Sequence, residues 1–89
     1  MQGRKEILVK ALGEIIKSRR ETSGKTIYKI SAESQMSKST WREAELGVCK
    51  DINLSTLWKI SEGLEINPAV IIDELYIKLG KEFSLIDSD

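Results

Sequence analysis

The stretch TIYKISAESQMSKSTWREAELG, residues 26–47, predicts two short helices joined by a tight turn. Thr26 is a favourable N-cap for the first helix, and Ile27 and Ile30 mark the inner face of that helix. Ser31 places a small side chain where the two helices are expected to cross. The stretch therefore predicts a helical corner, and the other segments are expected to pack around it.

The second helix of this corner is expected over residues 38–46, with Ser37 as its N-cap. The i, i+3 spacing turns Trp41 and Ala44 inward, with Leu46 as a further candidate for the inner face. The residues that remain outside are Lys38, Ser39, Arg42 and Glu43. Cations and short hydrogen-bonding groups on so short a helix suit insertion into a DNA major groove. The alternative is an ordinary solvated helix face.

The pattern around this corner resembles the Cro/CI-like (XRE-type) helix-turn-helix family over roughly residues 12–75. The matching residues are Ile16, Arg20, Gly24, Thr26, the run 36–41, Glu45, Gly47, Leu54, Leu57, Ile60, Leu64 and Ile66. The resemblance implies an all-α, five-helix, lambda-repressor-like domain that binds duplex DNA. Small phage and plasmid repressors and the controller proteins of restriction–modification systems are similar in length and pattern.

The resemblance also implies roles for individual residues. Base contacts are expected from Lys38, Ser39, Arg42 and Glu43, and the chemistry agrees, because Lys and Arg donate to guanine and Glu accepts from cytosine. Phosphate contacts, which position the protein without selecting sequence, are expected from Lys25, Thr26, Lys29, Ser37, Thr40, Lys50 and Asn53. A structural ion pair is expected between Arg20 and Glu45.

Two positions depart from the family pattern. Ile27 stands where relatives often carry a Gln that contacts the DNA backbone, so more of this task is expected of Lys25, Thr26 and Lys29. Gln35 stands in the turn where many relatives have Gly. A positive φ at a residue with a Cβ costs about 1 kcal/mol, so the turn is expected to be strained.

The charges are divided between the two halves of the chain, although the net charge is zero. Residues 1–50 hold 11 Lys and Arg against 6 Asp and Glu, a balance of +5, whereas residues 51–89 hold 3 against 8, a balance of −5. A basic front and an acidic back would orient the molecule on a polyanion. The alternative is chance clustering in a small protein.

Other function classes find little support in the sequence. The 89 residues, 40% of them hydrophobic, predict one domain over 1–89. One cysteine, Cys49, and no histidine argue against a disulfide framework, a zinc site and the usual catalytic constellations. No membrane span or secretory signal is recognisable, so a cytoplasmic protein without cofactor, metal or small-molecule ligand is expected.

Helices are also expected on both sides of the corner. A first helix over 5–20 carries the apolar stripe Ile7, Leu8, Ala11, Leu12, Ile15 and Ile16. Gly13 weakens this helix by about 1 kcal/mol relative to Ala, and Arg19 is a candidate for solvent or phosphate. Asn53 is expected to cap a fourth helix, most of whose apolar residues should complete the core: Leu54, Leu57, Trp58, Ile60 and Leu64.

The pair Asn67-Pro68 predicts the start of a fifth helix, which is expected to run to about residue 81 or 83. This helix is apolar around more than one stripe, which favours a second subunit as its partner. The expected dimer contacts are Ile72, Leu75, Tyr76 and Leu79. The alternative is that the first helix of the same chain covers both stripes. The three residues before Lys5 and the tail 84–89 are expected to be loose.

Together these expectations describe a homodimer that binds a palindromic operator in double-stranded DNA and represses transcription by occupying a promoter. One alternative is an antitoxin-type autoregulator that also binds a toxin. The other is a protein-binding adaptor that keeps the fold without contacting DNA, which the Ile27 departure and zero net charge would suit.

Overall fold

A computed structural model describes residues 3–86, and the expectations for residues 1–2 and 87–89 lie outside this range. The described chain forms a compact all-α globule of five helices, with no strand between residues 3 and 86. The helices are α1 (Arg4–Ser23), α2 (Ile27–Glu33), α3 (Lys38–Leu46), α4 (Leu54–Leu64) and α5 (Pro68–Leu79). None of them is long and apolar enough to cross a membrane.

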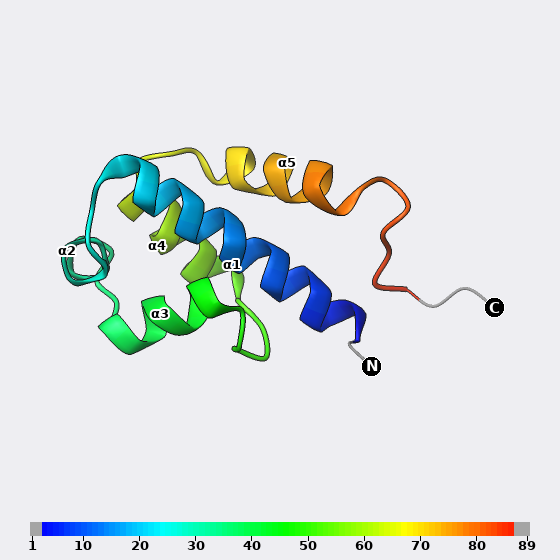
Figure 1. The fold of residues 1–89 in the computed structure, drawn as a ribbon, viewed down its shortest axis with the longest axis horizontal. Helices are drawn as coiled ribbons and strands as arrows, with labels where there is room; N and C mark the ends of the chain where they lie inside the picture. Colours follow the sequence, from blue (N-terminus) through cyan, green and yellow to red (C-terminus); the bar gives the residue numbers. More distant parts are fainter. Residues whose placement is uncertain (1–2, 87–89) are drawn as a thin grey trace.

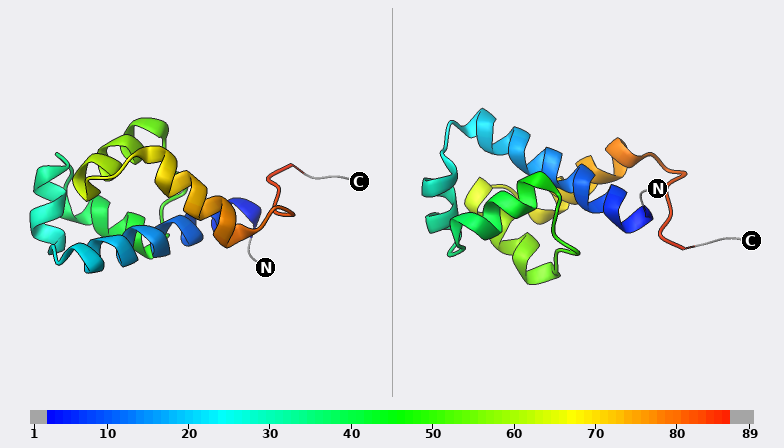
Figure 2. Two further views of the ribbon diagram at one scale, coloured as in Figure 1. Left: turned by 90° about the horizontal axis from the view of Figure 1, so that it is seen from above. Right: turned by 60° about the horizontal axis from the view of Figure 1, so that its bottom comes forward.

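Helix α1 lies between α3 and α5, which pack on opposite sides of it (Figure 1). The start of α1 and the segment after α5 lie at the end of the molecule away from α2 (Figures 1 and 2). One core joins the helices, and its fully buried side chains include Ile16, Ile30, Trp41, Ile60 and Ile71. Each helix therefore contributes to a single core.

Gly13 brings the backbones of α1 and α3 into contact. A Cβ on this residue would lie 2.5 Å from the carbonyl oxygen of Ala44 and 2.6 Å from that of Glu45. The glycine that weakens α1 in isolation is thus required by its packing. The expected stripe of α1 needs one change: Val9 is buried, whereas Ile7 lies partly in solvent.

Helix α5 is attached to α1 by charge pairs as well as by the core. Arg19 pairs with Glu74, which corrects the expectation that Arg19 faces solvent or phosphate. Lys78 Nζ lies 3.2 Å from Glu14 Oε2. The helix ends at Leu79, earlier than residue 81 or 83, because Gly80 leaves the helical conformation at φ 87°.

The two ends of the described chain meet. Arg4 Nη1 donates to the carbonyl oxygen of Ile86 at 2.7 Å and to that of Ser84 at 3.3 Å. The expected loose ends need correction at both sides, because Arg4 already belongs to α1 and the tail is held as far as Ile86.

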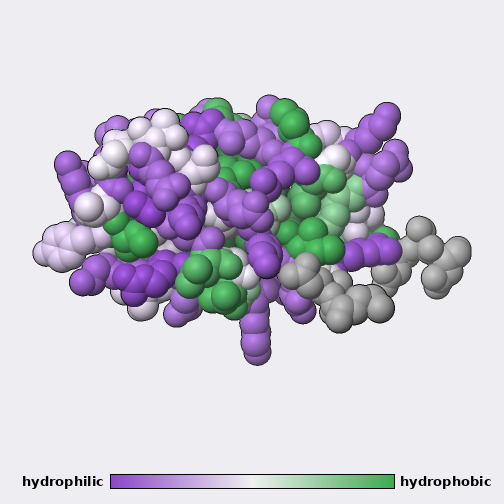
Figure 3. Space-filling view, in the orientation of Figure 1, coloured by the Kyte–Doolittle hydropathy of each residue, from purple (hydrophilic) through white to green (hydrophobic). Residues whose placement is uncertain are grey.

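Helix α4 places fewer apolar side chains in the core than its pattern predicts. Leu57, Ile60 and Leu64 are buried, but Leu54 is 71% exposed and Trp58 is 53% exposed. These two side chains lie one helical turn apart on a side of α4 that no other helix covers. On the face shown in Figure 3, hydrophobic residues likewise reach the surface in several separate places.

Candidate nucleic-acid interface

The corner of α2 and α3 is built by caps that the sequence encodes directly. Thr26 Oγ1 accepts from the Lys29 amide at 3.1 Å, and Ser37 Oγ accepts from the Thr40 amide at 3.1 Å. Between the helices, the Met36 amide donates to the Ser31 carbonyl at 2.9 Å, and Ser31 is buried at the crossing. Both helices begin at the residues predicted for them.

Gln35 adopts the left-handed conformation expected in the turn, with φ 56°. Such a backbone costs a residue with a Cβ roughly 1–2 kcal/mol. Gln35 adopts this conformation because it reverses the chain between Ser34, the C-cap of α2, and Ser37, the N-cap of α3.

The inner side of α3 carries Trp41, Ala44 and Glu45, all of them buried. Leu46, a candidate for that side, is 59% exposed instead. Leu46 is the last residue of α3 and precedes the left-handed Gly47, and Glu45 occupies the inward position before it. Trp41 has no exposed surface, which excludes its side chain from a wedge between bases in this conformation.

Glu45 receives hydrogen bonds from two helices. Arg20 of α1 donates through Nε and through Nη2, the latter at 3.1 Å from Oε1, and Trp41 Nε1 donates to Oε2 at 2.6 Å. The hydrogen bond with Glu45 raises the pKa of Arg20 above its ordinary value. The expected ion pair is present, with side chains only 14% and 4% exposed, and it fixes α3 against α1.

The opposite side of α3 is exposed, and we call its four residues the α3 outer face: Lys38, Ser39, Arg42 and Glu43. The side chains of Arg42 and Glu43 form no hydrogen bond or ion pair with the described residues. Ser37 Oγ links the hydroxyls of Ser39, at 3.2 Å, and Thr40, at 2.7 Å. The face therefore offers two cations, a carboxylate and a small group of hydroxyls on a helix fixed from behind.

The lysines expected to contact phosphate differ in whether they already form an ion pair within the chain. Lys29 and Lys50 are exposed and form no ion pair within residues 3–86. Lys25 is already engaged, since its Nζ lies 2.8 Å from Glu33 Oε1 and 3.3 Å from the Gly63 carbonyl. The hydrogen bond between Lys25 and Glu33 raises the pKa of Lys25 and lowers the pKa of Glu33. Lys25 is thus already paired within the chain, and its phosphate contact stays a prediction.

The three helix caps among these candidates keep groups that can donate. The Thr26 and Ser37 hydroxyls accept from backbone amides and retain a hydrogen of their own. Asn53 Oδ1 accepts from the Thr56 amide at 2.8 Å and from Ser55 Oγ at 2.9 Å, which leaves the Asn53 amide nitrogen available. Thr40, the third residue of α3, is exposed as well.

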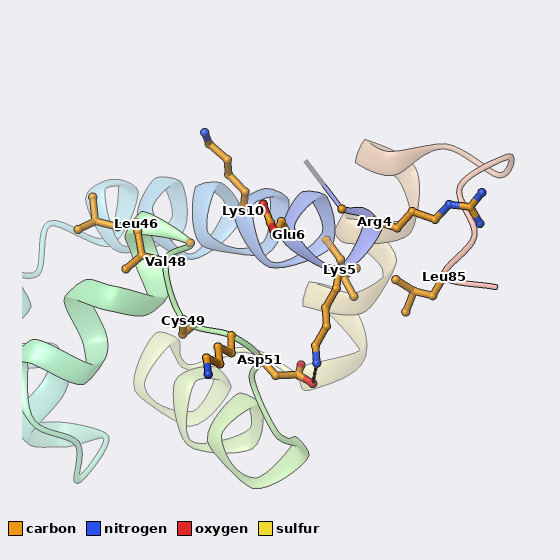
Figure 4. Close-up of a pocket in the computed structure, with 13 residues that line it drawn as sticks. Arg4, Lys5, Glu6, Lys10, Leu46, Val48, Cys49, Asp51 and Leu85 are labelled. Carbon is orange, nitrogen blue, oxygen red and sulfur yellow. Dashed lines mark ion pairs between the residues drawn. The ribbon is translucent and has the colours of Figure 1, made fainter. Parts of the chain in front are cut away.

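A groove of about 1350 Å³ separates the start of α1 from the loop that follows α3 (Figure 4). Lys5 Nζ lies 3.1 Å from Asp51 Oδ2 across it, and this hydrogen bond lowers the pKa of Asp51. Cys49 in the same loop is partly buried, and desolvation raises its thiol pKa, so it carries little thiolate at neutral pH. The loop that carries Lys50 is therefore tethered to α1.

Tyr28 is a residue of this region that the sequence did not single out. It is 71% exposed, and Lys38 Nζ lies 5.2 Å from the centre of its ring. An aromatic residue just after an N-cap, outside the apolar spacing of Ile27 and Ile30, is the signal that was available.

The expected dimer contacts on α5 divide into two groups. Ile72 and Tyr76 are exposed, as a subunit interface requires. Leu75 is only 7% exposed and Leu79 packs against the core, so they belong to the monomer, because the side of α5 that faces α1 takes them up. Val70 and Ile77 are exposed apolar residues of α5 that the sequence did not assign to the interface.

No protein-family model matches the chain, and no curated protein sequence matches it. Within the described residues there is no group of three or more side chains suited to hold a metal ion. The α3 outer face carries hydrogen-bond donors and acceptors of the kinds that bind base edges. Its cations can donate to guanine O6 and N7, its hydroxyls can donate or accept, and Glu43 can accept from cytosine N4.

Proposed function

We propose that this chain binds duplex DNA sequence-specifically as a homodimer of Cro/CI-like type and represses transcription by occupying a promoter. The observation that carries the proposal is the α3 outer face. Its polar and charged groups are exposed on one side of a helix whose other side is held by Trp41 and Glu45. A positioned helix with donors and acceptors matched to base edges is what major-groove recognition requires.

In this proposal α3 enters the major groove and makes the base contacts. Backbone phosphates are contacted from its flanks, by Lys29, Thr26, Ser37, Thr40, Lys50 and Asn53. The two copies of α3 in a dimer lie about one DNA turn, ~34 Å, apart, so the operator is a two-fold palindrome.

The distribution of charge supports this orientation. The basic half of the chain includes α1 to α3, whereas α5 carries the exposed Asp73 and lies on the side of α1 away from α3 (Figure 1). Phosphate would attract the first region and repel the second. Zero net charge is compatible with DNA binding when the charges are separated in this way.

The exposed side of α5 is the proposed subunit interface. Its apolar residues Val70, Ile72, Tyr76 and Ile77 are not needed by the core of the same chain. A two-fold axis would place this surface against its own copy, as is usual in small homodimers.

The test is selection of bound sequences from a random duplex pool at moderate salt, followed by mass measurement of the retained complex. We expect enrichment of a two-fold symmetric site bound by a dimer. The double variant Lys38→Ala/Arg42→Ala, with an unchanged helical circular-dichroism spectrum, should enrich no site. If the folded wild-type protein enriches no site, the proposal is wrong and the protein-binding adaptor is the better interpretation.

A second candidate is an antitoxin-type autoregulator, and the exposed Leu54 and Trp58 favour it. These side chains lie on α4 and are not part of the proposed dimer surface of α5, and the core does not use them. This candidate would bind the same DNA and also form a stoichiometric complex with a second small protein. Co-expression with its neighbouring reading frame and weighing of the purified complex would distinguish the two.

A further inference from the structure

Tyr28 exposes its ring at the edge of the proposed recognition surface. It is the second residue of α2, and 71% of its surface is accessible to solvent. The inner side of α2 is formed by Ile30 and Ser31, so the core makes no use of the Tyr28 ring. The side chain has no hydrogen-bond partner among residues 3–86.

The Tyr28 ring lies beside the ammonium group of a residue of the α3 outer face. Lys38 Nζ lies 5.2 Å from the ring centre, within the range of a cation–π interaction. Lys38 is the first residue of α3, so the contact spans the turn between the helices. It therefore couples the start of α2 to the start of the recognition helix.

Lysine has a flexible stem, and an unrestrained ammonium loses much rotamer freedom when it binds a base. A ring beside the ammonium reduces this loss by favouring the rotamers that keep Nζ near the turn. The ammonium has three hydrogens, so it can face the ring and still donate to guanine O6 and N7.

We propose that Tyr28 is a specificity-determining residue of the DNA-binding surface, which holds Lys38 toward one guanine and donates its own hydroxyl to a neighbouring phosphate. The inference rests on the proposed function of α3. It assigns two separate tasks to one side chain: the ring acts through Lys38 on base preference, and the hydroxyl acts on affinity for every sequence.

The experiment measures binding of the selected site and of its three substitutions at the base pair where Lys38→Ala loses preference. Wild type is compared with Tyr28→Ala, Tyr28→Phe, Lys38→Ala and the double variant Tyr28→Ala/Lys38→Ala. Lys29→Ala is the matched control, since it removes the next exposed residue of α2 without touching Lys38. Unfolding midpoints of all variants are compared to show that the fold is kept.

We expect Tyr28→Ala to weaken binding of the selected site by about threefold to fivefold and to reduce discrimination at the base pair of Lys38. The double variant should discriminate no less than Lys38→Ala alone. Tyr28→Phe should keep base preference while weakening all sequences equally, as Lys29→Ala should.

Two results would overturn the role of Tyr28 alone: a Tyr28→Ala variant with full base discrimination, or losses of discrimination that simply add in the double variant. Either result presupposes a wild-type protein that selects a site, so it contradicts the role of Tyr28 without contradicting the proposed function. A wild type that selects no sequence would overturn the proposed function and the role of Tyr28 together.

Discussion

The indole N–H of Trp41 donates to Glu45 Oε2 at 2.6 Å, one helical turn further along α3. The same carboxylate accepts two hydrogen bonds from the guanidinium of Arg20. A charged group that a core would ordinarily exclude is thereby satisfied by three donors from two helices.

Removing one partner of this cluster should be costly. Glu45→Ala leaves the Arg20 charge and the Trp41 N–H without their acceptor, and we expect a loss of about 3–5 kcal/mol in the free energy of unfolding. Urea denaturation measures it. Lys5→Ala, which breaks the exposed pair with Asp51, is the control and should cost far less, because solvent screens that pair. Equal losses in the two variants would contradict the structural role of the cluster.

Gly13→Ala should destabilise the protein although alanine is the better helix former. Propensity alone predicts a gain of about 1 kcal/mol, but the added methyl group would meet the Ala44 and Glu45 carbonyl oxygens. Overpacking of this kind costs about 1–3 kcal/mol. Ser18→Ala, at an exposed position of the same helix, should be neutral or slightly stabilising in the same thermal unfolding experiment. A stabilised Gly13→Ala variant would show that α1 and α3 lie further apart.

Gln35→Gly should stabilise the protein. Glycine adopts φ 56° without the penalty of a Cβ, although it loses more backbone entropy on folding, so the expected net gain is about 0.5–1 kcal/mol. Gln35→Val should lose stability, because a β-branched residue tolerates this conformation least. Chemical denaturation of the three proteins gives the order, and a valine variant as stable as the glycine variant would be inconsistent with a left-handed residue 35.

Base contacts and phosphate contacts should respond differently to substitution. Lys38→Ala and Arg42→Ala should each weaken the selected site by about 1–3 kcal/mol and relax preference at one base pair. Lys50→Ala should weaken all sequences similarly and lower the salt dependence of binding. Fluorescence anisotropy with matched and substituted duplexes at several salt concentrations measures both effects. If all three variants behave alike, α3 does not make the base contacts.

Ile72→Asp or Tyr76→Asp should yield monomers, because either change replaces an exposed apolar side chain of the proposed interface with a second charge beside Asp73. Sedimentation equilibrium reports the mass. Leu54→Asp introduces the same charge on the exposed side of α4 and should leave the dimer intact. A monomer produced by Leu54→Asp and not by the α5 variants would place the subunit interface on α4.

Local signals predicted the corner of residues 26–47 closely. The caps Thr26 and Ser37 and the left-handed Gly47 set its boundaries through bonds to residues only a few positions away. The predictions failed where the answer depends on a distant partner. Arg19 pairs with Glu74, 55 residues later, and the spacing of residues along the sequence does not predict such a contact.

Periodicity also could not decide which apolar residues of a helix are covered. Leu54 and Trp58 share an apolar spacing with Leu57, but only Leu57 meets another helix. The same limit applies to α5, where Leu75 was assigned to a dimer and is buried within the monomer. Burial is a property of how helices are arranged, whereas the sequence pattern defines only which residues share a side.

Because α1 packs against α3 at Gly13, the two sides of α3 differ in how well they tolerate substitution. The inner side is fixed to α1 by backbone contact and by the Glu45 cluster, so a substitution there disturbs the whole domain. The side chains of Arg42 and Glu43 on the outer face form no hydrogen bond or ion pair within residues 3–86, so they can be exchanged at little cost in stability. Under the proposed function, surface substitutions on this face change the sequence that is bound, while the scaffold that presents them stays the same.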